Sequence, residues 1–216
     1  MVKINRKKYD VCPDVQRLIN AAPKWDGNGK FNWRIEIEGR GFHIRKRLLP
    51  VLLEMTQRHC AFCDYYPLSE ELINPIPIEH FFPKSKNKFP EKAYEWRNLF
   101  PSCNGCTSKK KDRFDKKLLK PDDEDYSFDA FFEVSGDGKL MPSKIADSES
   151  KERAKVTIEI YGLNTRGVLL SERKKHLRDY LRIAPINDID DRPYRFLIKN
   201  IKEPFNPDDV INRFFQ

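Results

Sequence analysis

The chain has 216 residues, of which 39% are hydrophobic and 34% charged, enough for one domain or a small module with appended elements. No apolar run approaches the roughly 20 residues of a membrane-spanning helix, and the first residues contain no apolar stretch typical of a secretory signal. We therefore expect a soluble cytoplasmic protein without a membrane partner.

The positive charge is concentrated in one segment. The whole chain has a formal net charge of +8, and residues 84–120 alone contain 12 Lys and Arg against 4 Asp and Glu. The rest of the chain is therefore neutral. A basic segment on a neutral body indicates a polyanionic partner such as nucleic acid. A lysine-rich surface that is only solvated is the alternative.

The N-terminal region, residues 1–57, is predicted to be a flank with one helix. Residues 23–41 are polar and contain several Gly and Asn, which favours a loop or an irregular hairpin. The apolar spacing of residues 43–58 predicts a helix, which Pro50 is expected to kink or split. Cys12 is interpreted as a small buried hydrophobic residue or an idle thiol.

The other four cysteines, in residues 58–117, form two C-x-x-C pairs. Cys60 and Cys63 make the first pair, and Cys103 and Cys106 follow after 39 intervening residues. A reducing cytoplasm argues against disulfides, whereas paired thiolates at this spacing are typical of a closed tetrahedral zinc site. Because a closed site leaves no position for substrate, zinc is expected to organise the fold. A rubredoxin-type iron site has the same ligands but would not explain the acid and histidine between the pairs.

That acid and histidine are Glu79 and His80. Residues 74–83, NPIPIEHFFP, predict a strand bounded by prolines. Neighbouring strand residues point to opposite faces, so both side chains can serve one site only near the strand's end or at a twist. After the second cysteine pair, the basic run at 103–114 predicts the beginning of a helix. The cysteines would then hold a strand–loop–strand–helix unit in place.

The C-terminal region, residues 118–216, begins with an acidic, loop-like stretch at 120–142. Helices are predicted at about 148–161 and 165–183, the second with leucines along one stripe. The Asn164–Thr165 pair is expected to cap the start of the second helix. We interpret this region as mainly helical and as a surface for docking a partner.

The motif order in the middle of the chain resembles that of the HNH endonucleases. C-x-x-C is followed by IEHFFPKS at 78–85 and WRNLFPSCNGC at 96–106. These motifs are similar to those of the PtuB-type HNH nucleases of Septu and retron anti-phage systems. The resemblance covers roughly residues 58–115. It implies an α+β fold: a zinc-clasped, treble-clef-like ββα-metal core at 58–117, embedded in mainly α-helical flanks at 1–57 and 118–216.

The resemblance also implies a function and partners. It implies a metal-dependent endonuclease that cleaves nucleic acid as the effector subunit of a defence complex. The expected protein partner is an ABC-type ATPase, PtuA. In retron systems, the reverse transcriptase and its msDNA would join through the same complex.

The family's site residues are carried over by position. His80 matches the general base that deprotonates the attacking water, and Glu79 matches a ligand of the catalytic Mg²⁺ or Mn²⁺. Asn98 matches the asparagine that orients the loop and the histidine. The chain departs from the pattern at Thr107, where family members usually have His or Asn. A threonine hydroxyl can contact Mg²⁺ but is a weaker ligand than imidazole, and Asn104 is an alternative.

Basic side chains around the site are predicted to hold phosphates without reading bases. They are Lys84, Lys86, Lys109, Lys110, Lys111 and Arg113. The target is either DNA or RNA, a tRNA-like substrate included. Two other functions stay open. One is a zinc-clasped nucleic-acid-binding module without catalysis. The other is a structural or regulatory subunit whose role is to dock on a partner. For the nuclease itself, the resemblance implies docking on the ATPase through apolar positions of the C-terminal helices: Leu169, Leu170, Leu177 and Leu181.

Overall fold

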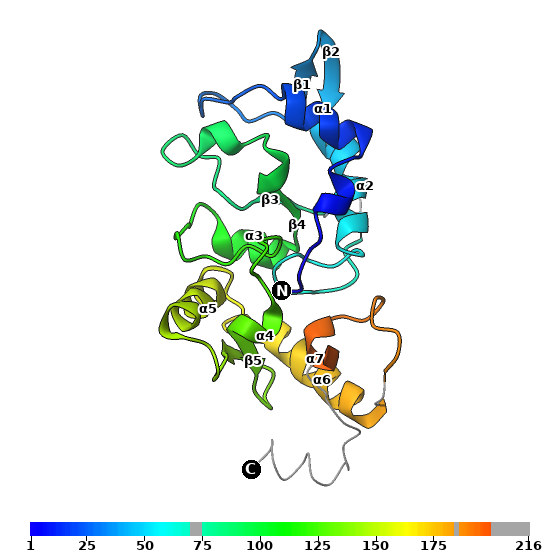
Figure 1. Ribbon diagram of the computed structural model, residues 1–216, viewed down its shortest axis with the longest axis vertical. Coiled ribbons are helices and arrows are strands. Elements are labelled where there is room, and N and C mark those ends of the chain that lie inside the picture. Colours follow the sequence, from blue (N-terminus) through cyan, green and yellow to red (C-terminus); the bar gives the residue numbers. More distant parts are fainter. Residues whose placement is uncertain (70–74, 184–185, 200–216) are drawn as a thin grey trace. The chain divides into compact units, whose positions relative to one another are not determined.

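The computed structural model describes residues 1–69, 75–183 and 186–199 (Figure 1). Helices and small two-stranded sheets follow one another along the chain, which confirms the expected mixed α+β class. The described residues divide into two compact units. One contains Ile4–Ala61 and Leu68–Phe114, and the other contains Met1–Lys3, Phe62–Pro67 and the described residues from Asp115 onward. None of the helices in the described ranges combines the length and the apolar character that a membrane span requires.

The N-terminal elements of the first unit are helix α1 (Pro13–Ala21), strands β1 (Arg34–Ile37) and β2 (Arg40–His43), and helix α2 (Ile44–Met55). The strands form an antiparallel hairpin whose two turn residues, Glu38 and Gly39, both have positive φ angles. This is the turn geometry that matches the twist of a hairpin. Helix α2 has the predicted position, and Pro50 does not split it.

The middle of this unit contains a β–β–α arrangement. Strand β3 (Ile78–His80) pairs antiparallel with β4 (Leu99–Pro101), and helix α3 (Asn104–Lys110) follows closely after β4 (Figure 1). Between the strands lie the short 3-10 helices η2 (Pro90–Lys92) and η3 (Trp96–Asn98). Strand β3 is shorter than the predicted 74–83, and residue 74 lies outside the described residues. All six strand residues are buried, so this small sheet is part of the core.

The second unit departs from the expectation in the acidic stretch at 120–142. Instead of a loop, it contains helix α4 (Phe128–Phe131) and an antiparallel pair of strands, β5 (Phe132–Val134) and β6 (Leu140–Pro142). The reason is local apolar content: Phe128, Phe131, Phe132 and Leu140 are buried and supply a core despite the surrounding acids. Helix α7 (Arg195–Lys199) is the last described element, and residues 200–216 lie outside the described residues.

Helices α5 (Ser148–Ile160) and α6 (Gly167–Ile183) confirm the two predicted C-terminal helices. The expected cap at Asn164 is not formed by this side chain. Its amide instead pairs with the backbone of Leu140, accepting from the N–H at 2.9 Å and donating to the carbonyl at 2.7 Å. Leu169 is only 6% exposed because it faces the core, so it cannot belong to an exposed docking surface. The other three leucines of that prediction are half-buried.

Candidate functional site

The four cysteines of the two C-x-x-C pairs form one cluster. Their sulfur atoms all lie within 4.8 Å of one another. Zinc–sulfur bonds of about 2.3 Å in a tetrahedron place the sulfurs about 3.8 Å apart. The cysteines therefore lie close enough to bind a metal ion such as zinc. The backbone N–H of Cys103 donates to Sγ of Cys60 at 3.3 Å, a contact that favours the thiolate form needed for metal binding.

His80 ends strand β3, and only 5% of the residue is exposed. Its Nε2 atom lies 2.9 Å from the carbonyl oxygen of Ala93. Because a carbonyl can only accept a hydrogen bond, Nε2 carries the proton and Nδ1 keeps the lone pair. Burial and the nearby charge of Lys84 lower the pKa of His80 to about 3, although the bond to Ala93 opposes the shift. The ring is therefore neutral at pH 7, with its lone pair on Nδ1.

Glu79 forms a buried ion pair with Lys110. The Lys110 Nζ atom lies 2.9 Å from Oε1 of Glu79 and also donates to the His80 carbonyl oxygen at 2.6 Å. The Lys110 side chain is 0% exposed. Burial raises the pKa of the Glu79 carboxyl and lowers that of the Lys110 ammonium, and the charge of each partner opposes the shift of the other.

This placement corrects the expectation for Lys110. The sequence places Lys110 among the groups that contact phosphate at the surface, but the structure turns its ammonium group inward. A buried carboxylate is costly unless a charged partner and hydrogen bonds compensate it. Lys110 is that partner for Glu79, so it is an internal component of the site.

Thr107 lies one turn before Lys110 on α3, and its hydroxyl helps to favour the charged form of Glu79. Although it lies near Glu79, its buried Oγ1 atom makes no hydrogen bond of normal length and angle with the described residues. A carboxylate beside an unpartnered hydroxyl offers two hard oxygen donors, which Mg²⁺ and Mn²⁺ prefer. These residues fit a divalent cation, with the Lys110 ammonium as its competitor for Glu79. The alternative ligand, Asn104, is exposed at the start of α3.

Asn98 fixes the backbone around the histidine. Its Oδ1 atom accepts from the Phe82 N–H at 2.6 Å, and its Nδ2 atom donates to the carbonyls of Phe82 and Lys92 at 3.0 and 2.8 Å. The residue is 1% exposed. Lys92 immediately precedes Ala93, whose carbonyl holds the His80 ring. Asn98 therefore acts on His80 through the backbone rather than by touching the imidazole.

Aromatic residues of the N-terminal region cover His80, although sequence reasoning assigned no site role to residues 1–57. Trp33 stacks on the imidazole, with ring centroids 5.5 Å apart and an interplanar angle of 25°. Phe31 meets the same imidazole edge-on, at 5.4 Å and 90°. The available sequence signal was the interleaving of aromatic and basic residues in KFNWR, residues 30–34.

The remaining basic residues of the prediction lie at or near the surface. Lys86, Lys109, Lys111 and Arg113 are exposed, and Lys84 is half-buried. The Arg113 guanidinium donates to the Lys109 carbonyl oxygen, with its Nη2 at 2.6 Å. The ammonium groups of Lys109 and Lys111 are thus on the exposed part of the segment that contains the buried Lys110.

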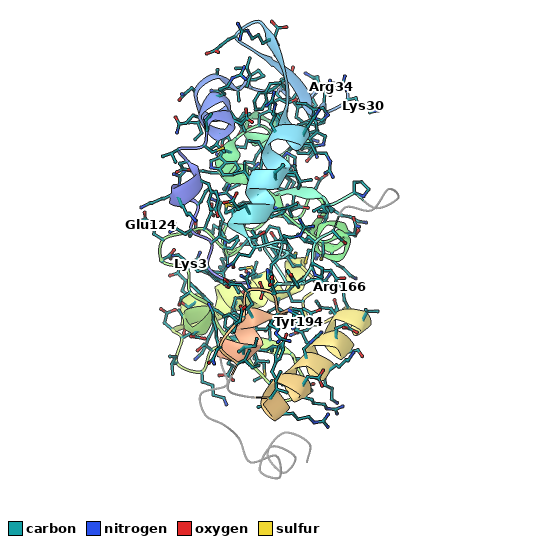
Figure 2. All side chains as sticks on the ribbon, turned by 90° about the vertical axis from the view of Figure 1, so that its right-hand side faces the viewer. Lys3, Lys30, Arg34, Glu124, Arg166 and Tyr194 are labelled. Carbon is teal, nitrogen blue, oxygen red and sulfur yellow. The ribbon has the colours of Figure 1, made fainter. Side chains whose placement is uncertain are left out.

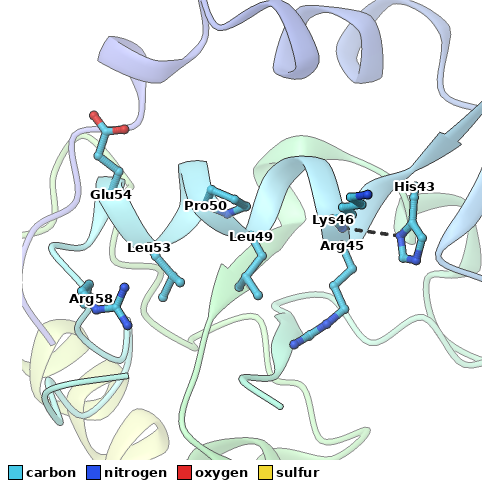
Figure 3. A pocket seen from close by; sticks show the side chains of 8 residues that line it. All are labelled: His43, Arg45, Lys46, Leu49, Pro50, Leu53, Glu54 and Arg58. Carbon is cyan, nitrogen blue, oxygen red and sulfur yellow. Dashed lines mark hydrogen bonds between the residues drawn. The ribbon is translucent and has the colours of Figure 1, made fainter. Parts of the chain in front are cut away.

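A pocket of about 690 Å³ lies along helix α2 (Figure 3). Its lining combines leucines and a proline with basic side chains, and it includes none of the predicted site residues. His43 and Glu54 stand at opposite ends of the helix in Figure 3, so they do not form an acid–base pair. His43 instead caps α2, because its Nδ1 accepts from the Lys46 N–H at 3.4 Å. We therefore keep the candidate site at Glu79 and His80.

Comparison with known proteins gives one partial relationship. No protein-family model matches the chain. Over 66 residues the chain is 41% identical to Septu protein PtuB of Bacillus thuringiensis, a match that covers 31% of this chain and 24% of that protein. The chain thus spans only about a quarter of this relative's length. Within these limits, the comparison shows a PtuB-like sequence relationship.

Proposed function

We propose that the chain is a metal-dependent HNH-type endonuclease that hydrolyses phosphodiester bonds in DNA or RNA. The observation that carries this proposal is the setting of His80: a buried neutral imidazole, held through Nε2 by the Ala93 carbonyl and adjacent to Glu79. Strands β3 and β4 are followed by α3, and one cysteine pair precedes β3 while the other lies at the start of α3. This order supports assigning residues 58–117 to a ββα-metal core.

The residues of the chain have separate roles in this proposal. Nδ1 of His80 accepts a proton from the water that attacks phosphorus, because Nε2 is engaged by Ala93. Glu79 and Thr107 are the residues that would hold the cation. When bound, Mg²⁺ or Mn²⁺ supplies the positive charge that stabilises the developing negative charge on the phosphate. Asn98 keeps the Ala93 carbonyl in place through its bond to the preceding residue.

Cleavage by a His80→Ala variant tests the proposal. Plasmid nicking and RNA cleavage, each with and without Mg²⁺ or Mn²⁺, should fall by at least about 10²-fold in this variant, with zinc content and folding unchanged. His176→Ala is a matched control, since His176 is a half-buried histidine on helix α6. Wild-type cleavage by His80→Ala would remove the histidine from this role.

A second candidate function is a zinc-clasped nucleic-acid-binding or regulatory subunit that does not cleave. The observation in its favour is that the Lys110 ammonium already neutralises Glu79, while Thr107 supplies a weaker ligand than the His or Asn expected at its position. This alternative predicts binding of labelled oligonucleotides without cleavage in either Mg²⁺ or Mn²⁺. The assays above therefore separate the two functions.

The PtuB relationship supports a cellular role for the nuclease. We place the chain in the cytoplasm as the effector subunit of an anti-phage defence complex with an ABC-type ATPase, PtuA. In a retron system, the reverse transcriptase and its msDNA would belong to the same complex. Co-expression with an ATPase encoded beside this chain should yield a complex that co-purifies. An ATPase and a nuclease that purify separately would contradict this role.

A further inference from the structure

Residues 30–34, KFNWR, form a segment that we call the aromatic–basic segment. Phe31 and Trp33 are half-buried, whereas Lys30, Asn32 and Arg34 are exposed. Half-buried and exposed side chains thus alternate along these five residues, which lie just before and at the start of β1. Figure 2 shows Lys30 and Arg34 projecting from the ribbon at the surface. The segment thus combines half-buried rings, which keep part of their surface exposed, with fully exposed cations.

The rings of this segment belong to an aromatic cluster that includes the His80 imidazole. In addition to the contacts with His80, Phe31 stacks on Tyr94 at 5.2 Å and meets Trp25 edge-on at 5.3 Å. The Tyr94 hydroxyl donates to the Asn32 carbonyl oxygen at 2.9 Å, which fixes the backbone of the segment. The segment is therefore held against the proposed general base by both ring contacts and a hydrogen bond.

The turn after β3 brings another cation to the cluster. The Lys84 Nζ atom is 4.9 Å from the centroid of the Phe31 ring. Gly27 packs so closely on Lys86 that a Cβ atom at this glycine would lie 2.6 Å from the Lys86 Cα. The loop that carries Trp25 thus rests on the basic turn after β3. Positive charges from two distant parts of the sequence gather around a group of half-buried rings.

We propose that the aromatic–basic segment binds a nucleobase next to the scissile phosphate, which makes the substrate single-stranded or locally unstacked nucleic acid. Aromatic side chains stack on any base, and neighbouring cations hold the flanking phosphates. Bases within a duplex already stack on each other and must be extruded before a ring can reach them. This inference rests on the proposed function, because it names the substrate class of that site.

Binding in the absence of cleavage tests the inference. The full chain, in buffer without added Mg²⁺ or Mn²⁺, is titrated against a short fluorescent thymidine oligonucleotide, its abasic counterpart and a duplex. The abasic strand keeps the phosphates but removes the stacking partner. The thymidine strand should bind about 5- to 150-fold more tightly than the abasic strand, the range that stacking of one base gives. Equal affinity of the wild-type chain for the two strands would overturn the inference.

Variants locate the effect in the segment. Trp33→Ala should lose the preference for the base-bearing strand while its affinity for the abasic strand stays unchanged, and Trp33→Tyr should retain the preference. Tyr65→Ala is the control, because Tyr65 is an aromatic residue outside the segment and is 43% exposed. Lys30→Ala or Arg34→Ala should weaken binding to both strands alike. Each should also lower the dependence of log affinity on log salt concentration by up to about 0.7 for each lost phosphate contact.

Two outcomes for a folded Trp33→Ala variant would contradict the inference. If the preference for the base-bearing strand persists, the ring serves only to pack on His80. If the affinity for both strands rises, the segment is a cover that keeps nucleic acid away. Cleavage is scored separately: a chain that prefers bases without cleaving fails only the proposed nuclease function, and a nuclease without base preference fails only this inference.

Discussion

The four-cysteine cluster and the Glu79–His80 site are assembled by different means. In the cluster, each C-x-x-C pair places two ligands together locally, and one long-range contact completes the set. At the site, His80 donates a hydrogen bond to the Ala93 carbonyl oxygen and stacks on Trp33, while Glu79 pairs with the charge of Lys110. A cluster of cysteines can thus be predicted from their spacing, whereas the partners of the buried Glu79 and His80 leave no such pattern in the sequence.

The run of three lysines at 109–111 shows the same contrast on the scale of one helix end. Lys109 and Lys111 are exposed, but the side chain of Lys110 is fully buried against Glu79. Lys109 and Lys110 are successive residues of α3 and are rotated by about 100° about its axis, whereas Lys111 follows the helix with a positive φ angle, so the three side chains face different surroundings. Identical residues in one tripeptide therefore divide into two classes, one facing solvent and one inside the site.

The largest effect is expected at the cysteine cluster. Cys106→Ser should lose its zinc and its cooperative thermal unfolding, since structural zinc contributes up to about 10–16 kcal/mol to folding in small zinc domains. Elemental analysis and calorimetry measure the two losses together. Cys12→Ser is the control, because Cys12 lies outside the cluster. A wild-type chain that folds without zinc would show that the cysteine cluster is not a structural zinc site.

The next largest effect is expected for Lys110→Met. This substitution leaves the buried Glu79 carboxylate without its charge partner, and such a loss costs about 3–5 kcal/mol of unfolding free energy in denaturant titrations. Lys111→Met is a matched control at an exposed neighbour and should change the free energy by no more than about 0.5 kcal/mol. Equal effects of the two substitutions would show that Lys110 is a surface lysine after all.

Two additions sharpen the Lys110 prediction. Adding Glu79→Gln to Lys110→Met should restore part of the lost stability, because it removes the uncompensated charge. Mn²⁺ should raise the Tm of Lys110→Met more than that of the wild type, because the ammonium no longer competes for the carboxylate. A Tm that Mn²⁺ leaves unchanged in both proteins would count against a cation at Glu79.

A smaller effect is expected for Asn98→Leu. The substitution removes three hydrogen bonds and leaves partly buried backbone groups of Phe82 and Lys92 without this partner, which costs about 1–3 kcal/mol of unfolding free energy. Thermal unfolding of this variant and of Asn87→Leu, at an exposed asparagine, measures the difference. A neutral Asn98→Leu variant would indicate that the loop after β3 holds its shape without this side chain.

The smallest change in stability is expected when Lys109 and Lys111 are both replaced by Ala. Both are exposed, so the free energy of unfolding should change by no more than about 0.5 kcal/mol. Binding to unrelated duplexes should nevertheless weaken uniformly. The slope of log affinity against log salt concentration should fall by up to about 0.9 per lost phosphate contact. Lys155→Ala, at an exposed position of α5, is the control. Loss of binding to one sequence alone would contradict a phosphate contact.

The sequence by itself determined the features whose signals are local. Helices were predicted where α2, α5 and α6 form, on apolar spacing for α2 and α6, and the spacing of the cysteines predicted the set that forms the cluster. The prolines around residues 75–83 marked the strand that carries Glu79 and His80, although the observed strand is shorter. Helical periodicity and C-x-x-C pairs depend on residues a few positions apart, which is why they can be read without a fold.

Only the tertiary structure decided what surrounds those residues. The Ala93 carbonyl selects which nitrogen of His80 carries the proton, Lys110 turns inward to match Glu79, and Trp33 reaches the imidazole from the N-terminal region. The hairpin of β5 and β6 likewise forms in a stretch whose acidic composition indicated a loop. The contacts around Glu79 and His80 join residues far apart in the sequence, and their burial and charge compensation become defined only when the chain has brought them together.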